Sequence, residues 1–461
     1  MAVAALLLAG CSTEFFDLPN TNAPTQDQLT GAPTKSILAR AAVGVAASFT
    51  NDVIGEITQF SYLGREGWNL QGNDPRLTVE MVRGPQDPGG HSAGSYNGKY
   101  QALRSVNTYL EGIDAAPDMT DAEKAASKGF AKTLKAIILH RLIVRNNQLG
   151  TAVDVEAGLD APPAPFLPRD QVYTRIAALL DEANTDLGSG GAAFPFTVPP
   201  GYAGFDTPST FRQFNRAYMA KVQAHIATFL GTGATAYTAA LTALGQSFID
   251  PAGDLQNGVY YAYSPTAPEP ANTISQAVNT VQYYVHQSVK TGVQLKANND
   301  PDERYTSKVA ETDPRTQNDL TSSLKPVMYN VPATLAPDLG ADIPVIKNEE
   351  LILLRAEARW FTGDKSGALT DINTIRVNSG GLAPTTLTTG SSDQEFITEL
   401  VYNRLYSLLW EQGVRWTDAR RFNLINTLPV DRAGDQIFPS MVIPQDECNA
   451  RGLQPPCAPA S

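Results

Sequence analysis

Apolar residues recur at helical spacing along most of this chain, most clearly between residues 347 and 423. A first apolar stripe in this region ends at Gly363, and a second one ends at Gly380 and Gly381. Such spacing is typical of amphipathic helices, and glycines are typical stop signals. The pattern therefore predicts two short helices joined by a tight turn, the first capped by Asn348. The two stripes consist of Leu351, Leu354, Ala358, Phe361, Leu369, Ile372 and Ile375.

A third helix follows in the same region. Ser392 precedes Glu395 by three residues, which is the capping-box pattern of a helix N-terminus, and a new apolar stripe begins behind it. Hairpins of helices this short cannot bury their apolar faces alone, so they must stack on other hairpins. We therefore expect a mainly α protein built on a tetratricopeptide-like scaffold of helical hairpins.

The same periodicity predicts helices over residues 34–49, 100–114, 121–146, 169–187, 210–231 and 234–249. Two long stretches, about 50–98 and 250–344, lack it, and the second shows only strand-like patches at 259–263 and 325–330. Irregular segments of this length in a compact domain are usually functional. We expect residues 31–461 to form one helical domain in which these two stretches are loop-rich insertions that face a ligand.

Composition excludes some functions. The chain has 461 residues, a formal net charge of −12 and 18% charged residues. A surface this acidic repels phosphates, so nucleic acid is not an expected partner. No run of about 18 apolar residues is evident, so we expect no membrane-spanning helix.

The N-terminus carries a different signal. Residues 4–9 are apolar, and Leu8, Ala9 and Gly10 precede Cys11 as in a bacterial lipobox. We interpret residues 1–10 as a truncated lipoprotein signal peptide, because a basic n-region is missing, and residues 11–30 as a polar tether lipidated at Cys11. The alternative is a chance apolar terminus with a free cysteine.

The two other cysteines, Cys448 and Cys457, lie nine residues apart in a Pro-rich tail. In an exported protein such a pair predicts a disulfide. Zinc is the alternative, but no histidine lies near and two thiolates are too few ligands.

No motif of a known catalytic centre is evident, and His140 and His225 lie inside helical patterns. We therefore expect neither enzymatic activity nor a cofactor or bound metal. The segment 299–305 places three carboxylates within four residues, which could hold Ca²⁺ but lacks EF-hand spacing, so a solvated acidic turn is favoured. Arg415, Asp418 and Arg421 share a helical face and favour an internal ion-pair lattice.

Aromatic residues in polar loops predict a ligand site. A sugar ring can stack its C–H face on an aromatic ring while amides and guanidinium groups bind its hydroxyls. Three tryptophans, Trp360, Trp410 and Trp416, lie in helical segments and are expected in the core. The alternative for the loop aromatics is that they seal the loops onto the scaffold. The predicted ligand-binding residues are Trp68, Asn69, Gln71, Asn73, Arg76, Tyr260, Tyr261 and Tyr263.

Three motifs resemble a known family. They read PFLPRDQVYTRIAALLDEANTDL at 165–187, LLRAEA with DINTIR at 353–376, and EQGVRWTDARRF at 411–422. Together they resemble the SusD-like (RagB/SusD) family, and the chain departs from the family's Glu- and Arg-rich pattern at 403–408. That departure weakens the expectation of a salt-bridge network there.

The resemblance implies a nutrient-binding lipoprotein of the cell outer membrane, facing the exterior. Such a protein captures oligosaccharides, or peptides, for a SusC-like TonB-dependent transporter and contacts the membrane only through its lipid anchor. The alternatives are a secreted glycan-acting hydrolase and a helical-repeat surface scaffold that binds no small ligand.

Overall fold

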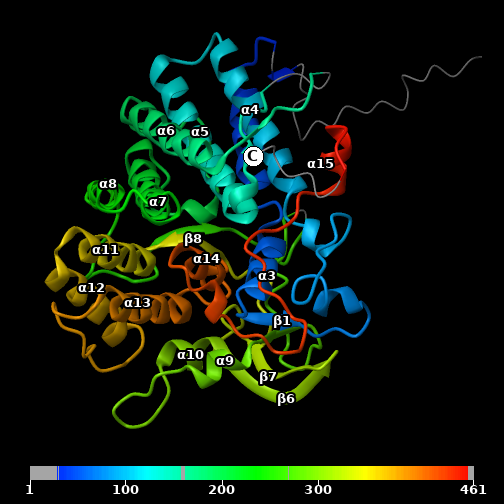
Figure 1. Cartoon of the computed structure of the whole chain (residues 1–461). Coiled ribbons are helices and arrows are strands. Elements are labelled where there is room, and N and C mark those ends of the chain that lie inside the picture. The colour runs from blue at the N-terminus through cyan, green and yellow to red at the C-terminus, as the bar shows by residue number, and fades with distance from the viewer. Residues whose placement is uncertain (1–27, 30, 157–160, 268, 455–461) are drawn as a thin grey trace, which may run out of the picture.

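Helices stacked side by side make up the larger part of the molecule (Figure 1). The computed structural model describes residues 28–29, 31–156, 161–267 and 269–454. The helices run over α2 (Lys35–Ser48), α3 (Val53–Leu63), α4 (Asn97–Ala115), α5 (Asp121–Asn146), α6 (Arg169–Gly188), α7 (Pro208–Phe229), α8 (Ala234–Leu244), α9 (Gln287–Thr291), α10 (Glu303–Lys308), α11 (Asn348–Thr362), α12 (Lys365–Asn378), α13 (Asp393–Ser407), α14 (Val414–Arg421) and α15 (Gln445–Ala450).

Consecutive long helices pair as hairpins, and the hairpins pack on one another. The pairs α5–α6, α7–α8 and α11–α12 are in contact, α6 packs on α7, and α8 packs on α11 (Figure 1). Each hairpin thus buries on its neighbour the apolar face that it cannot bury alone. The predicted mainly α, tetratricopeptide-like architecture is confirmed.

Local signals in the sequence explain several helix ends. Capping boxes form at Thr120 with Glu123 and at Ser392 with Glu395, the second as predicted. The cap predicted at Asn348 is wrong by one residue, because Lys347 is the N-cap of α11. The Asn348 side chain instead accepts a hydrogen bond from the Asp250 amide at 2.9 Å and donates to the Asp250 carbonyl oxygen at 2.7 Å. It therefore ties α11 to the chain that leaves α8.

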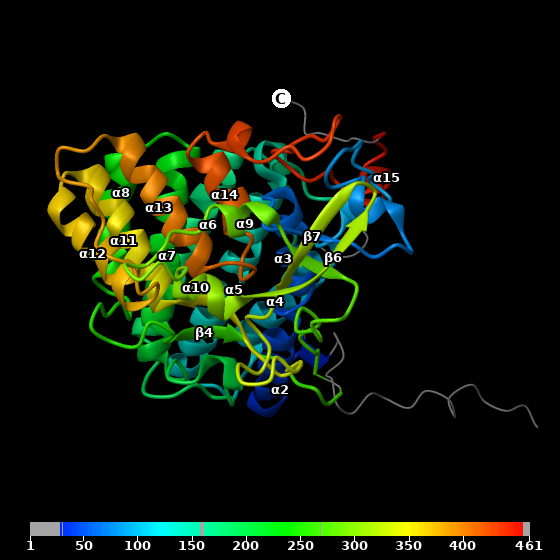
Figure 2. The ribbon, with the colours of Figure 1, turned by 90° about the horizontal axis from the view of Figure 1, so that it is seen from below.

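In the part of the chain that the structure describes, strands form four antiparallel pairs, β1–β5, β2–β3, β4–β8 and β6–β7. The predicted patch at 259–263 is β4, and that at 325–330 overlaps the end of β7. The long hairpin of β6 with β7 extends along one side of the molecule (Figure 2) and was not predicted. The strands run over β1 (Gly67–Asn69), β2 (Thr151–Ala152), β3 (Phe166–Leu167), β4 (Gly258–Tyr261), β5 (Tyr283–Val285), β6 (Val309–Gln317), β7 (Leu320–Pro326) and β8 (Ile343–Lys347).

The stretch 50–98 is less irregular than expected, because it begins with the 11-residue helix α3. Only from Gly64 to Tyr96 does it consist of a short strand, 3-10 turns and loops. The described part of the stretch 250–344 contains four complete strands, the start of β8 and two short helices between its loops. The first insertion and the β6–β7 hairpin lie on the side of the molecule away from α8 and α12 (Figures 1 and 2). Other parts of the second insertion contact the scaffold there, because Asp250 is bonded to Asn348 of α11 and the Glu303 amide donates to the Gly380 carbonyl oxygen just beyond α12.

The core runs through the hairpins and under both insertions. Trp360, Trp410 and Trp416 are each at most 2% exposed, so the prediction that they belong to the core is confirmed. Trp360 stacks on Phe396 with ring centroids 4.2 Å apart and planes inclined by 4°, which joins α11 to α13. Such contacts stabilise beyond simple burial of area.

One apolar stretch departs from the sequence prediction. Among the described residues, Lys35–Leu63 is long and apolar enough to cross a membrane, judged by length and composition alone. In the fold it is divided into α2 and α3 by a turn, and both helices contribute residues such as Leu38 and Ile57 to the core. Because core helices pass the same test, this is a weak indication of a membrane span.

Three predictions fall wholly or partly on residues that the structure does not describe. Cys11, the signal segment 1–10 and most of the tether lie outside the described residues, as does Cys457. Cys448 is described, and it is fully buried and disulfide-bonded. Its pairing with Cys457 stays a prediction.

Candidate ligand-binding groove

Trp68 lies on β1, whose partner β5 places Tyr284 opposite it. The indole is 3% exposed and meets the ring of His286 edge-on at 4.5 Å between centroids. An indole closed on all sides in this way offers no face on which a sugar ring could stack. The position fits the alternative, that the aromatic ring seals the loop onto the scaffold.

The polar residues predicted beside Trp68 do not act together. Asn69 is buried, and its Oδ1 accepts a hydrogen bond from the Gln71 amide at 3.0 Å. Asn73 and Arg76 are exposed, and Arg76 pairs with Asp74 at 2.8 Å. Hydrogen bonds from Arg76 and then from His91 hold the pKa of the Asp74 carboxyl well below its usual range. The Asp74 carboxylate therefore stays charged and keeps the Arg76 guanidinium in an ion pair.

The three predicted tyrosines lie at β4 and just beyond it. Tyr261 is 2% exposed, packs on Phe49 at 5.0 Å between centroids and accepts a hydrogen bond from Arg141. Tyr263 is buried as well, and the half-buried Tyr260 donates its hydroxyl to the Gln256 carbonyl oxygen. No hydrogen bond or ring contact between described residues joins these tyrosines to Trp68. The predicted set thus does not form one site.

An open groove of about 710 Å³ lies between two loops that are far apart in sequence, residues 83–88 and 434–442. Pockets that hold small ligands commonly have volumes of about 300–1,000 Å³. We call this hollow the loop groove. Its walls carry one aromatic ring, Phe438, together with the polar side chains of Arg83, Gln86, Gln436 and Ser440.

Buried arginines hold the second loop in place. Arg65 donates to the Gln436 carbonyl oxygen at 2.9 Å, Arg145 to that of Val442 at 2.9 Å, and Arg420 to that of Pro439 at 3.1 Å. A loop without regular structure cannot satisfy its own carbonyl groups, so donors from the scaffold must do so. The irregular loop is therefore positioned as firmly as a strand would be.

Gln86 closes the floor of the loop groove. Its side-chain amide donates to the Ser440 carbonyl oxygen at 3.1 Å and accepts from the Val442 amide at 2.9 Å. Gly84 has φ +78°, and a Cβ there would come within 2.7 Å of the Phe438 ring. Glycine at this position thus lets the half-buried Phe438 ring lie against the first loop.

Sequence reasoning missed the loop groove. The predicted irregular stretch 50–98 includes one wall of the groove, residues 83–88, but the ligand role within that stretch was assigned to Trp68 and its neighbours. A weak signal was present, because Phe438 is an aromatic residue in a tail rich in Pro, Gly and polar residues. What the sequence does not show is that the arginine-bound tail returns to the first insertion.

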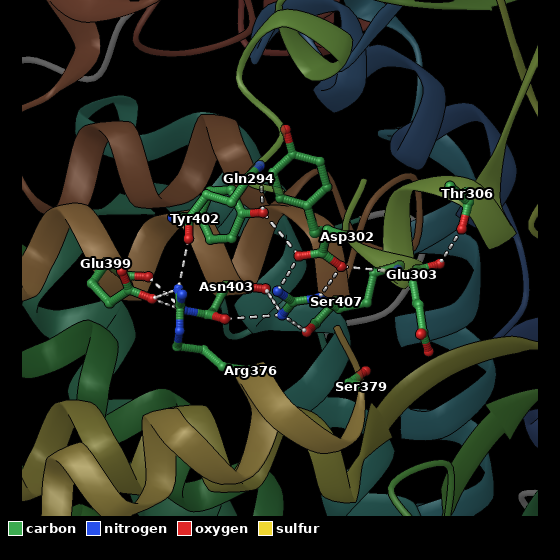
Figure 3. A network of polar contacts seen from close by, with 12 residues as sticks. Gln294, Asp302, Glu303, Thr306, Arg376, Ser379, Glu399, Tyr402, Asn403 and Ser407 are labelled. Carbon is green, nitrogen blue, oxygen red and sulfur yellow. Dashed lines mark hydrogen bonds and ion pairs between the residues drawn. The ribbon is translucent and has the colours of Figure 1, made fainter. Parts of the chain in front are cut away.

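The segment 299–305 contributes Asp302 and Arg304 to a structural clamp with α13 (Figure 3). Arg304 binds both carboxylate oxygens of Asp302, at 3.0 and 2.6 Å, and Tyr402 donates to the same carboxylate at 2.8 Å. Arg304 also donates to Asn403 Oδ1 at 3.0 Å and Ser407 Oγ at 3.1 Å. The interpretation as a solvated turn fits the exposed Asp300 but is wrong for the fully buried Asp302.

The ion-pair lattice predicted on α14 forms in part. Asp418 binds Arg421 at 3.1 Å, and it binds Arg404 of α13 at 2.6 Å. Arg415 takes no part in this lattice and donates to the Arg65 carbonyl oxygen at 2.7 Å. A buried salt-bridge network therefore exists at 403–408, although the sequence there departs from the family pattern.

Comparison with solved structures finds the same arrangement in SusD superfamily proteins. One from Bacteroides vulgatus aligns over 93% of this chain and 98% of its own, with a TM-score of 0.69 and 14% identity. One from Parabacteroides distasonis aligns over 89% and 97%, with a TM-score of 0.67 and 15% identity. Surface glycan-binding protein A from Bacteroides thetaiotaomicron, in complex with laminarihexaose, aligns over 90% and 98%, with a TM-score of 0.67 and 14% identity.

No family model and no curated protein matches the chain. At these sequence identities the structural likeness defines the fold. The chain has the SusD-like fold over nearly its whole length, as its motifs predicted.

Proposed function

We propose that this protein belongs to the SusD-like family and captures oligosaccharides at the cell surface. The observation that carries the proposal is the likeness of fold to a surface glycan-binding protein in complex with laminarihexaose over 90% of this chain. The loop groove supports it, since an aromatic ring beside amide and guanidinium groups suits a polyhydroxylated ring.

Binding measurements test the proposal. Calorimetric titration with laminarihexaose and a panel of other soluble glycans and peptides should find at least one glycan that binds. Phe438→Ala should weaken that binding at least about tenfold, because it removes the stacking surface. Phe422→Ala, which truncates another half-buried ring outside the loop groove, is the matched control and should leave the affinity unchanged.

The same samples separate capture from hydrolysis. A capture protein depletes free glycan without generating reducing ends, whereas a glycan-acting hydrolase generates them. Reducing ends that appear in proportion to protein would contradict the capture function. Retention of a transporter partner without binding to any glycan or peptide would instead indicate a surface scaffold.

The partner and the anchor belong to the same proposal. We propose that a SusC-like TonB-dependent transporter receives the ligand and that lipid on Cys11 holds the protein on the outer membrane, facing outward. Metabolic labelling with palmitate should mark the wild type and not Cys11→Ala. Absence of label from the wild type would refute the anchor without touching the glycan-binding proposal.

A further inference from the structure

A small cavity with charged and polar side chains on its wall lies among the helices of the scaffold and shares no lining residue with the loop groove. It has a volume of about 50 Å³, and its walls come from α3, α5, α7, α13, α14, β4 and β8. We call it the core cavity. Polar cavities of this size hold ordered water or an ion, because buried polar groups need partners.

A chain of hydrogen bonds determines the tautomers of His140 and His225, the two histidines that line the core cavity. Tyr218 Oη lies 2.9 Å from His140 Nδ1, and His140 Nε2 lies 2.9 Å from His225 Nδ1. Tyr173 Oη lies 3.5 Å from the same His225 Nδ1. If Tyr218 donates to His140 Nδ1, His140 Nε2–H donates to the single lone pair of His225 Nδ1, and His225 Nε2 carries N–H. The opposite tautomers would leave the buried Tyr218 hydroxyl proton without an acceptor, which is costly.

Two donors at the core cavity then remain unmatched. His225 Nε2 and Arg404 Nη1 are buried, and neither has a hydrogen bond or ion pair among the described residues. Both residues line the core cavity, and they are 2% and 1% exposed. The cavity therefore requires an occupant that accepts hydrogen bonds.

The charges around the core cavity favour a negative occupant. Of the described residues that line it, Arg141, Lys221 and Arg404 are cations, and the carboxylate is Glu56. Glu56 is shared, because it pairs with Lys99 as well as with Arg141.

The carboxylates just outside the cavity do not restore the balance. Lys221 pairs with Glu350 at 3.0 Å, while Asp418 and Glu357 serve Arg404 and Arg421 together. Three cations thus face one carboxylate on the cavity wall, and the carboxylates outside it are shared with other cations. Burial with nearby cations keeps His140 and His225 neutral by lowering their pKa, so the histidines add no charge. A small anion suits this excess of positive charge.

We propose that the core cavity is a binding site for one small monovalent anion of halide type, held by Arg404 Nη1 and His225 Nε2. The anion would join α7 to α13 at the point where the hairpins meet the insertions. It would thereby act as a structural ligand of the fold, whatever the protein captures outside.

Bromide is the probe that tests this site. Crystals of the wild-type protein grown with sodium bromide should show an anomalous peak in the core cavity, in contact with both donors. Protein dialysed into gluconate should then gain about 1–3 °C in Tm for each tenfold rise in bromide at constant ionic strength. Water at the site with no anomalous peak, and a flat Tm, would overturn the proposal.

A variant links the effect to the site. His225→Leu removes one donor and leaves all the charges, so the bromide concentration at which Tm begins to rise should be at least tenfold higher than for the wild type. His286→Leu replaces a different buried histidine, 3% exposed, that does not line the core cavity, and it should keep the wild-type response. An equal loss of response in both variants would also overturn the proposal, and the wild-type anomalous experiment does not depend on either variant folding.

Discussion

At the scale of single residues, burial gives different roles to side chains that look alike in the sequence. Asp302 and Glu303 are neighbours in an acidic turn, yet Asp302 is fully buried in a bidentate ion pair while Glu303 is exposed and pairs with Lys296 at 3.0 Å. A buried charge that loses its partner is costly, whereas a surface pair contributes little. The two positions therefore make a matched test of the clamp.

Asp302→Asn should destabilise the protein by about 3–5 kcal/mol, because it leaves the Arg304 guanidinium buried without a counter-charge. Glu303→Gln should change stability by less than about 0.5 kcal/mol. Urea denaturation followed by circular dichroism measures both. Equal effects of the two substitutions would show that the clamp does not hold the insertion.

Trp68 allows a second test, which distinguishes sealing from binding. Trp68→Ala should cost about 3–5 kcal/mol of stability, since a buried indole is lost and a cavity remains. Arg76→Ala, at an exposed position of the same loop, should cost less than about 0.5 kcal/mol. The folded fraction of Trp68→Ala should bind glycan as the wild type does. If Trp68→Ala kept full stability but lost glycan binding, Trp68 would instead belong to the ligand site.

At the scale of elements, the irregular segments are fixed by their ends and by donors from the scaffold. The β6–β7 hairpin turns at Asn318 and Asp319, whose φ values are 48° and 63°. Asn and Asp tolerate this left-handed region better than most residues, as two-residue hairpin turns require. The Asn318 carbonyl oxygen in turn accepts a hydrogen bond from Arg432, so the turn is bound to the C-terminal loop.

The predicted disulfide between Cys448 and Cys457 is expected to stabilise only the C-terminal tail. A disulfide between Cys448 and Cys457 would close a loop of about ten residues and contribute roughly 2–3 kcal/mol on the chain-entropy model. Cys448→Ser should therefore loosen the tail beyond Pro444 and leave the helical scaffold folded. Hydrogen exchange on the wild type and the variant measures this, and loss of protection throughout α5 and α7 would contradict it.

Mass mapping checks the pairing itself. Without reduction, the peptides that contain Cys448 and Cys457 should appear as one linked species, two hydrogens lighter than its reduced form. Two free thiols in protein purified from an exported pool would refute the pairing.

At the scale of the whole molecule, buried histidines make stability depend on pH. Burial, aided by nearby cations, lowers the pKa of His140 and His225 well below 6.5 in the folded state. Below pH 6.5 these histidines become protonated in the unfolded chain but stay neutral in the folded one. Their contribution to the free energy of unfolding is therefore complete above pH 6.5 and is lost as the pH falls. Glu66 and Glu357 act in the opposite sense, because burial raises the pKa of their carboxyls.

A comparison with His225→Leu isolates the histidine term, since the carboxyls are common to both proteins. Between pH 6.5 and 5.5 the wild type should lose about 1 kcal/mol more stability than the variant. Urea denaturation at pH 7.5, 6.5 and 5.5 measures the difference. Parallel curves for wild type and His225→Leu would contradict the prediction.

The sequence by itself determined the helical scaffold. Spacing of apolar residues, capping boxes and glycine stops act over a few neighbouring positions, so the hairpins α7–α8 and α11–α12 and the core positions of Trp360 and Trp416 could be predicted. The motifs at 165–187, 353–376 and 411–422 also pointed to the fold that solved structures share.

Only the tertiary structure decided which loops form the groove that is the candidate ligand site. Whether an aromatic ring such as Trp68 lies open or closed depends on strand β5, more than 200 residues away along the chain, and not on its polar neighbours. The loop groove arises because Arg65, Arg145 and Arg420 bind the carbonyl groups of a distant tail. Contacts of this kind produce no periodic pattern in the sequence. An arginine that donates hydrogen bonds to the carbonyl groups of a distant loop cannot be distinguished there from one that is exposed to solvent.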